Sequence, residues 1–143
     1  MNDPQLVAAE FARAFRDAEY AMKRSGLLRL KKGPAQAGWN ALASELGQDF
    51  FQAVVNQGIA KTLISTNPRR LTSDLEWMPE TPTSLTNVNE LIVQGVCRVR
   101  NSYLHGEKFR GGPEGQWARD YTLIAEAHAV LNVAMEWWLQ SKG

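Results

Sequence analysis

The stretch 98-RVRNSYLHGEKF-109 contains residue types that can act on a phosphodiester. Arg100 and Asn101 are adjacent, and His105 follows four positions after Asn101. A second arginine, Arg98, stands two positions before Arg100. Guanidinium groups offer a fork of N–H donors matched to phosphate oxygens, and imidazole is the usual proton carrier near neutral pH. The stretch is therefore the first candidate for a catalytic or binding site.

The chain has two histidines, and their positions favour different roles. His128 lies in the middle of an apolar segment, which favours a packed side chain with one satisfied nitrogen. His105 follows the last apolar step of its segment and immediately precedes Gly106. A histidine at a helix C-terminus is stabilised as the cation by the helix dipole, which suits proton transfer near pH 7 but equally suits a purely structural charge. Both interpretations of His105 stay open on this ground.

Apolar residues at three- and four-residue steps predict a first helix from Pro4 to about Lys23. Its apolar stripe consists of Val7, Phe11, Phe15, Ala18 and Met22. Asp3 followed by Pro4 is a suitable cap and first-turn pair, and Gly26 is a natural end. This helix is the first of the elements that must position the candidate site.

The segments 38-GWNALASELG-47 and 48-QDFFQAVVNQG-58 predict two shorter helices, each closed by a glycine. A further short turn is expected around residues 60–65. Residues 67–85 contain three prolines and few apolar side chains, and predict an ordered loop. The side chains expected to hold this loop to the core are Leu71, Leu75, Trp77 and Met78. No segment alternates with period two for long enough to predict a strand.

The candidate site lies at the end of a better defined helix. Asn87, followed three residues later by Glu90, predicts a capping-box start, and Gly106 predicts the end. The apolar stripe of this helix is Ile92, Val96, Val99 and Tyr103. The helix therefore has an apolar body and a polar end that carries the motif.

A last long helix is predicted from about Trp117 to Gln140, after the glycine-rich stretch 111–115. Its seam is formed by Trp117, Tyr121, Ile124, His128, Leu131, Met135 and Trp138. Trp137 falls outside the seam, and an exposed aromatic there is typical of a dimer or partner interface. Together these segments predict a single all-α domain over residues 1–143, a bundle of about five helices in which two long terminal helices pack with shorter ones.

A helical wheel addresses which arginine belongs with His105. At about 100° per residue, Asn101 and His105 lie about 40° apart on the outward face, and Arg98 lies about 20° from His105. Arg100 lies about 140° from His105 around a continuous helix. The wheel thus favours Arg98, and Arg100 joins the site only if the helix unwinds near Gly106 or if the site is composed across a dimer.

The charge balance excludes binding of nucleic acid by bulk attraction, because 16 basic and 15 acidic side chains leave a net charge of +1. Local clusters remain: the acid-free basic stretch is Lys23, Arg24, Arg29, Lys31 and Lys32. Lys108 and Arg110 follow the motif and, with Arg98, are expected to contact an RNA backbone. The alternative interpretation of all these charges is a solvated face.

The remaining composition predicts a cytoplasmic protein without metal, cofactor or membrane association. Cys97 is the one cysteine and cannot form an intrachain disulfide, and two histidines with one cysteine do not supply a four-ligand zinc site. The N-terminal residues lack the features of a signal peptide, and no apolar run has the length of a membrane span.

The whole phrase, more than its spacing, resembles the RNase signature of the HEPN family. Ten of the 143 residues are arginine, so an arginine a few positions before a histidine arises readily by chance. The family's motif is Arg, four to six residues and His, often with a polar residue after the Arg, and Arg100, Asn101, His105 and Gly106 fit its Arg-Asn-x-x-x-His-Gly form. The resemblance is close over residues 91–109 and loose elsewhere, where 19-EYAMKRSG-26 and 39-WNALASEL-46 resemble the opening of some members.

The resemblance implies a HEPN-like bundle that forms a homodimer along its motif helices, with two Arg–His sets in one cleft. Catalytic members cleave RNA without metal, which implies catalytic roles for Arg100, Asn101 and His105, and products with a 2′,3′-cyclic phosphate and a 5′-hydroxyl. Many members are toxins or antiphage nucleases beside an antitoxin or a nucleotidyltransferase. Others are non-catalytic RNA-binding or scaffold domains. An unrelated bundle that matches by chance is the third interpretation.

Overall fold

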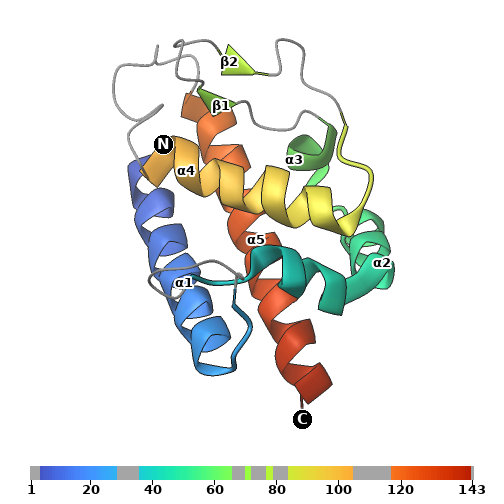
Figure 1. Cartoon of the computed structure of the whole chain (residues 1–143). Coiled ribbons are helices and arrows are strands. Elements are labelled where there is room, and N and C mark those ends of the chain that lie inside the picture. Colours follow the sequence, from blue (N-terminus) through green and yellow to red (C-terminus); the bar gives the residue numbers. More distant parts are fainter. Residues whose placement is uncertain are drawn as a thin grey trace.

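The computed structural model describes residues 4–28, 36–65, 70–71, 77–78, 84–104 and 117–142. Its elements in chain order are α1 (Pro4–Arg24), α2 (Trp39–Gln57), α3 (Lys61–Ser65), β1 (Arg70–Leu71), β2 (Trp77–Met78), the π-helix η1 (Glu90–Cys97), α4 (Arg98–Leu104) and α5 (Trp117–Lys142). The two long helices α1 and α5 lie side by side and run in the same direction, and η1 with α4 crosses them as one continuous rod (Figure 1). The predicted all-α bundle is confirmed, with its long helices near the two ends of the chain.

The apolar stripe of α1 faces the core as predicted. Phe11, Phe15, Ala18 and Met22 are buried, and Val7 is half-buried. Beyond the helix, Gly26 takes a left-handed φ of 79°, and the Leu27 N–H donates to the Met22 carbonyl across 2.9 Å. This closing turn satisfies carbonyls that the helix end would leave unpaired. A bridge between Leu28 and Ala37 then returns the chain to α1 and starts α2 beside it.

α2 is one element broken at Gly47. This glycine has φ 76° and ψ 173°, and it separates a first helical part that contains Leu42 from a second that contains Phe50. The second part ends at Gly58, whose left-handed backbone lets its N–H donate to the carbonyls of Val54 and Val55. The prediction of two short helices, each closed by a glycine, is thus confirmed.

The motif-bearing rod begins with the predicted capping interaction. The Asn87 Oδ1 accepts a hydrogen bond from the Glu90 backbone N–H at 2.9 Å, and the Glu90 carboxylate accepts one from the Thr86 N–H at 2.8 Å. The first eight residues of the rod, Glu90–Cys97, are a π-helix rather than the α-helix expected from the sequence. Short π-helical segments inside helices are frequent at functional sites, and this one directly precedes the motif.

The buried side of the rod formed by η1 and α4 packs against α3 and α5. Leu91, Ile92, Val96 and Val99 are all fully buried, so the predicted stripe lies in the core as far as its side chains are described. A Cβ added at Gly95 would meet Leu63 at 3.4 Å, so glycine lets η1 approach α3 closely. A carboxylate of α5, Glu126, accepts a 2.7 Å hydrogen bond from the Leu63 N–H and ties α3 to the long helix.

The C-terminal helix and the strand pair differ in part from expectation. Within the predicted seam Ile124, Leu131 and Trp138 are fully buried, and the neighbouring Trp137 is half-buried against Phe50 instead of exposed. The 67–85 segment contains a short antiparallel pair in which Arg70 faces Met78 and Leu71 faces Trp77, where no strand was predicted. None of the described helices is long and apolar enough to cross a membrane.

Candidate functional site

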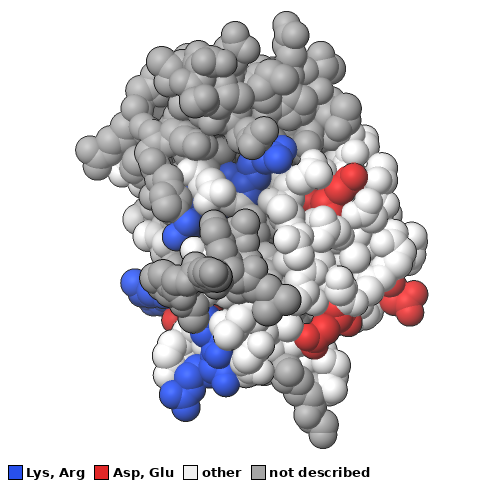
Figure 2. Space-filling view, viewed as in Figure 1, with Lys and Arg blue, Asp and Glu red and all other residues white. Residues whose placement is uncertain are grey.

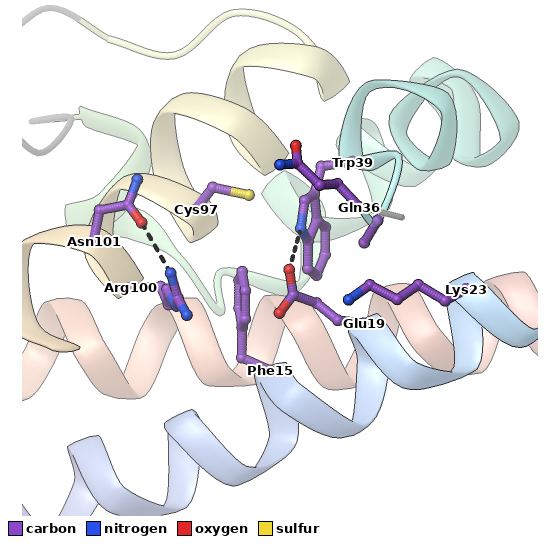
Figure 3. Close-up of a pocket in the computed structure, with 9 residues that line it drawn as sticks. Phe15, Glu19, Lys23, Gln36, Trp39, Cys97, Arg100 and Asn101 are labelled. Carbon is purple, nitrogen blue, oxygen red and sulfur yellow. Dashed lines mark hydrogen bonds between the residues drawn. The ribbon is translucent and has the colours of Figure 1, made fainter. Parts of the chain in front are cut away.

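A cavity of about 250 Å³ opens where α4 crosses α1 beside the start of α2 (Figure 3). The residues that line it come from three separate parts of the sequence: Phe15, Glu19, Lys23, Gln36, Ala37, Trp39, Cys97, Arg100 and Asn101. The cavity is therefore a product of tertiary packing. Two of the residues singled out in the motif, Arg100 and Asn101, belong to it.

Arg100 lies on the aromatic wall of the cavity. Its guanidinium carbon is 5.1 Å from the centre of the Phe15 ring, within the range of a cation–π interaction. One of its nitrogens, Nη1, donates a hydrogen bond to the Asn101 Oδ1 across 3.4 Å. The arginine is half-buried and the asparagine is exposed, so a cation and an amide stand together at the edge of a partly apolar hollow.

The aromatic wall continues on the other side of Phe15 with Trp39. Its indole ring stacks on Phe15 with 4.5 Å between centroids and 28° between planes. The indole Nε1 donates a hydrogen bond to the Glu19 Oε2 at 3.3 Å, so the tryptophan fixes the carboxylate at the cavity wall. Arg100, Phe15 and Trp39 thus form a continuous stack of flat groups, and Glu19 lies along its edge (Figure 3).

Charged and amide side chains complete the rim. Lys23 stands four residues after Glu19 on α1, and both line the cavity because residues at this spacing share a helical face. Gln36 reaches the rim because the bridge between Leu28 and Ala37 returns the chain to the end of α1. Figure 2 shows that the Lys and Arg side chains on this face gather mostly over α1, whereas most acids lie toward α2.

Cys97 supplies a neutral patch of the lining. Burial raises the pKa of its thiol from 9.0 to about 12; the negative charge of Glu19 acts in the same direction, and the positive charge of Arg100 opposes them. The thiol therefore stays protonated near neutral pH.

The motif residues fall into three groups. Arg100 and Asn101 share the cavity, whereas Arg98 is half-buried and does not line it. The helical wheel placed Arg98 beside Asn101 because it gives each side chain one fixed direction around the helix axis and takes no account of side-chain length or of neighbouring helices. The long Arg100 side chain instead lies across Phe15 of α1, which carries its guanidinium to Asn101. His105, Lys108 and Arg110 lie outside the described residues.

The other predicted features bear less on the cavity. His128 is half-buried on α5, with its ring 6.1 Å from that of Phe11, as expected for a packed histidine. Of the basic stretch, Lys23 and Arg24 are exposed at the end of α1, and the remaining three residues lie outside the described part. Within the described ranges no three His, Cys, Asp or Glu side chains are grouped so that they could hold a metal ion.

Glu19, Lys23 and Trp39 were not predicted as site residues. The available signal was the pair of opposite charges four residues apart on the helix that carries Phe15. Lys23 belongs to the basic stretch identified in the sequence, whereas Glu19 and Trp39 lie in 19-EYAMKRSG-26 and 39-WNALASEL-46, which carry only a loose resemblance to the opening of some HEPN members. Their place opposite Arg100 follows from the packing of α1 against α4.

No family model matches the chain, and neither a curated protein nor a solved structure is significantly similar to it. The HEPN resemblance therefore rests on the sequence: on the motif phrase, and more loosely on 19-EYAMKRSG-26, 39-WNALASEL-46 and the all-α setting of the motif.

Proposed function

We propose that the protein is a metal-independent endoribonuclease of HEPN type that acts in the cytoplasm as a homodimer, as a toxin or defence nuclease. The observation that carries the proposal is the shared cavity in which Arg100 and Asn101 stand opposite Glu19 and Lys23. A guanidinium and an ammonium at one opening suit an RNA phosphate, and the aromatic stack beside them suits an unpaired base. An antitoxin or a nucleotidyltransferase is the partner that such a toxin would have.

In the proposed reaction the 2′-oxygen of a ribose attacks the adjacent phosphorus, and the bond from phosphorus to the 5′-oxygen breaks. The proton of the 2′-hydroxyl leaves to a base, and a proton is delivered to the leaving 5′-oxygen. The products are a 2′,3′-cyclic phosphate and a 5′-hydroxyl. By resemblance to the family, His105 moves a proton and Arg100 stabilises the charge of the pentacoordinate phosphorus. Asn101 orients Arg100, to which it is hydrogen-bonded.

The test is cleavage of single-stranded and structured RNA in excess chelator. Arg100→Ala and His105→Ala are each expected to lower the rate by about 100-fold or more, which is typical for the loss of one stabilising donor or one proton-transfer group. Arg98→Ala tests the arginine favoured by the wheel. Arg16→Ala is the matched control, because it removes the same charge from a residue that is exposed on α1 and does not line the cavity.

Cleavage that is retained in Arg16→Ala and lost in both Arg100→Ala and His105→Ala supports the proposal. Loss in Arg98→Ala with full activity in Arg100→Ala overturns the assignment of the arginine. Absence of cleavage by the wild type, together with RNA binding, supports the second candidate, a non-catalytic HEPN-like RNA-binding or scaffold module. The near-neutral net charge of +1 favours the scaffold form of this second candidate, because any protein that binds long RNA gains from a basic surface.

A further inference from the structure

The cavity between α1 and α4 has features of a site for one flat, polar ring. At about 250 Å³ it lies just below the roughly 300–1,000 Å³ of sites that hold drug-sized ligands, so a single base fits its size better than a longer stretch of nucleic acid. Its wall is the half-buried indole of Trp39, already stacked on Phe15. Bases stack on such aromatic faces whatever their sequence, so the stack explains affinity for a base but not a choice among bases.

The choice among bases depends on the polar groups at the edge of the stack, of which Glu19 is the best fixed. Trp39 holds its carboxylate by one hydrogen bond at 3.3 Å to Oε2. An ionised carboxylate is a pure acceptor with about four lone-pair sites, so it can accept from further donors after the bond to the indole. Guanine presents two adjacent donors, N1–H and the N2 amino group, on its Watson–Crick edge. Adenine and cytosine present one amino donor beside an acceptor, which the carboxylate repels.

The remaining rim residues suit the rest of a guanine nucleotide. Gln36 and Asn101 both line the cavity, and their side-chain amides carry donors of the kind that an exocyclic oxygen such as O6 accepts. Lys23 and Arg100 supply positive charge for the phosphate that follows the base. Figure 3 shows these side chains arranged around one opening, with Glu19 and Trp39 on one side and Arg100 and Asn101 on the other.

We propose that this cavity is a guanine-binding subsite for single-stranded RNA, in which Trp39 stacks on the base and Glu19 accepts hydrogen bonds from its N1–H and N2 amino groups. The inference rests on the proposed endoribonuclease function and deepens it, because Arg100 lines the same cavity as Trp39 and Glu19. The enzyme then cleaves next to guanosine in unpaired RNA.

The test measures binding apart from cleavage. The probes are fluorescent uridine hexamers with a single central guanosine, inosine or adenosine, 2′-O-methylated throughout so that no cyclic phosphate can form. Inosine lacks only the N2 amino group. Wild type is expected to bind the guanosine hexamer about tenfold or more tightly than the inosine hexamer, since one hydrogen bond to a charged acceptor is lost. Fluorescence anisotropy at constant salt gives both dissociation constants.

Glu19→Gln isolates the carboxylate, since its amide oxygen can still accept the Trp39 N–H, while the amide donor opposes guanine. The variant is expected to lose the preference for guanosine over inosine. Glu10→Gln is the matched control, because it removes the same charge from a residue that is exposed on the same helix and does not line the cavity. Equal affinity of the wild type for all three hexamers, or a guanosine preference that survives Glu19→Gln, overturns the inference.

The cleavage assay separates this inference from the proposed function. Guanosine-selective binding without any RNA cleavage leaves the subsite standing and overturns the nuclease. Cleavage at all nucleotides alike, unchanged in its pattern by Glu19→Gln, leaves the nuclease standing and overturns the subsite.

Discussion

Two Phe–Trp pairs in the described part of the chain both use α2, and their surroundings differ. At the start of α2, Trp39 stacks on Phe15, donates to Glu19, and shares the ring of Phe15 with the Arg100 guanidinium. In the second part of α2, Phe50 meets Trp137 edge-to-face at 5.4 Å and 78°. Both tryptophans are half-buried and both phenylalanines are buried. Aromatic type and burial therefore do not distinguish the two pairs; the contacts of the first pair with Glu19 and Arg100 do.

The largest expected effect is on the free energy of unfolding, and it differs between alanine variants of the two phenylalanines. Phe50→Ala is expected to lower the free energy of unfolding by about 3–5 kcal/mol, because Phe50 is fully buried and leaves an enclosed void. Phe15→Ala is expected to lower it by less, because the space it leaves joins the open cavity and fills with water. Urea denaturation of both variants gives the difference. An equal or larger loss for Phe15→Ala would contradict the contrast between the two pairs.

The next effect separates the two tryptophans by ligand binding, and it depends on the proposed RNA site. Trp39→Ala is expected to weaken binding of the guanosine hexamer by about 5- to 150-fold, the range for loss of one base–aromatic stack. Trp137→Ala is expected to leave the affinity of the folded protein unchanged, although it removes packing from Phe50. Anisotropy titrations check both. If the two variants bind equally, the Phe15–Trp39 pair is core packing like its counterpart.

A smaller effect concerns Gly47, the break that lets α2 serve both pairs. Its φ of 76° with ψ of 173° falls in a region that only glycine adopts readily. Gly47→Ala is expected to lower the free energy of unfolding by about 1–3 kcal/mol, although a Cβ there would meet no other atom. Gly58→Ala is the comparison, since the left-handed helical backbone at that position is less restrictive. A denaturation midpoint of Gly47→Ala equal to that of the wild type would contradict the predicted backbone strain at this position.

The smallest effect concerns the Cys97 thiol, which lines the same cavity as the first pair. Because burial raises its pKa to about 12 from 9.0, the unfolded chain loses this proton at lower pH than the folded chain. Ionisation therefore favours unfolding, and the free energy of unfolding is expected to fall as the pH rises from 9 toward 12. Denaturation of wild type and Cys97→Ala at pH 7 and pH 10 isolates this contribution. A wild-type stability that falls no faster than that of Cys97→Ala would contradict the raised pKa.

Much of the fold could be predicted from local patterns. Local patterns, formed by residues within a few positions of one another, predicted three features. These are the buried stripe of α1, the glycines that end the two parts of α2, and the Asn87 cap. The π-helix could not be predicted, because the apolar steps of Ile92, Val96 and Val99 also fit an α-helix. A helix pattern also does not contain the contacts that bring Gly95 close to Leu63 and Leu85, which come from other parts of the chain.

The candidate site could be predicted only in part. The polar end of the motif helix was visible in the sequence, but its cavity partners Glu19 and Trp39 are distant in sequence and are brought to it by the packing of α1. A wheel drawn on one helix cannot represent a contact such as Arg100 over Phe15, which requires a second helix. The exposed aromatic expected at Trp137 was wrong for a similar reason, because Phe50 of α2 covers part of it.

The contact between Arg100 and Phe15 has a consequence for the entropy of binding. A free arginine side chain carries about 2 kcal/mol of rotamer entropy, part of which is lost when it grips a phosphate. Here the ring of Phe15 and the amide of Asn101 restrict the guanidinium before any ligand arrives. This part of the side-chain entropy is therefore lost during folding, when burial of the large core offsets the cost. A cation restrained in this way binds an anion with less ordering than one of the same charge on an open surface, such as Arg16.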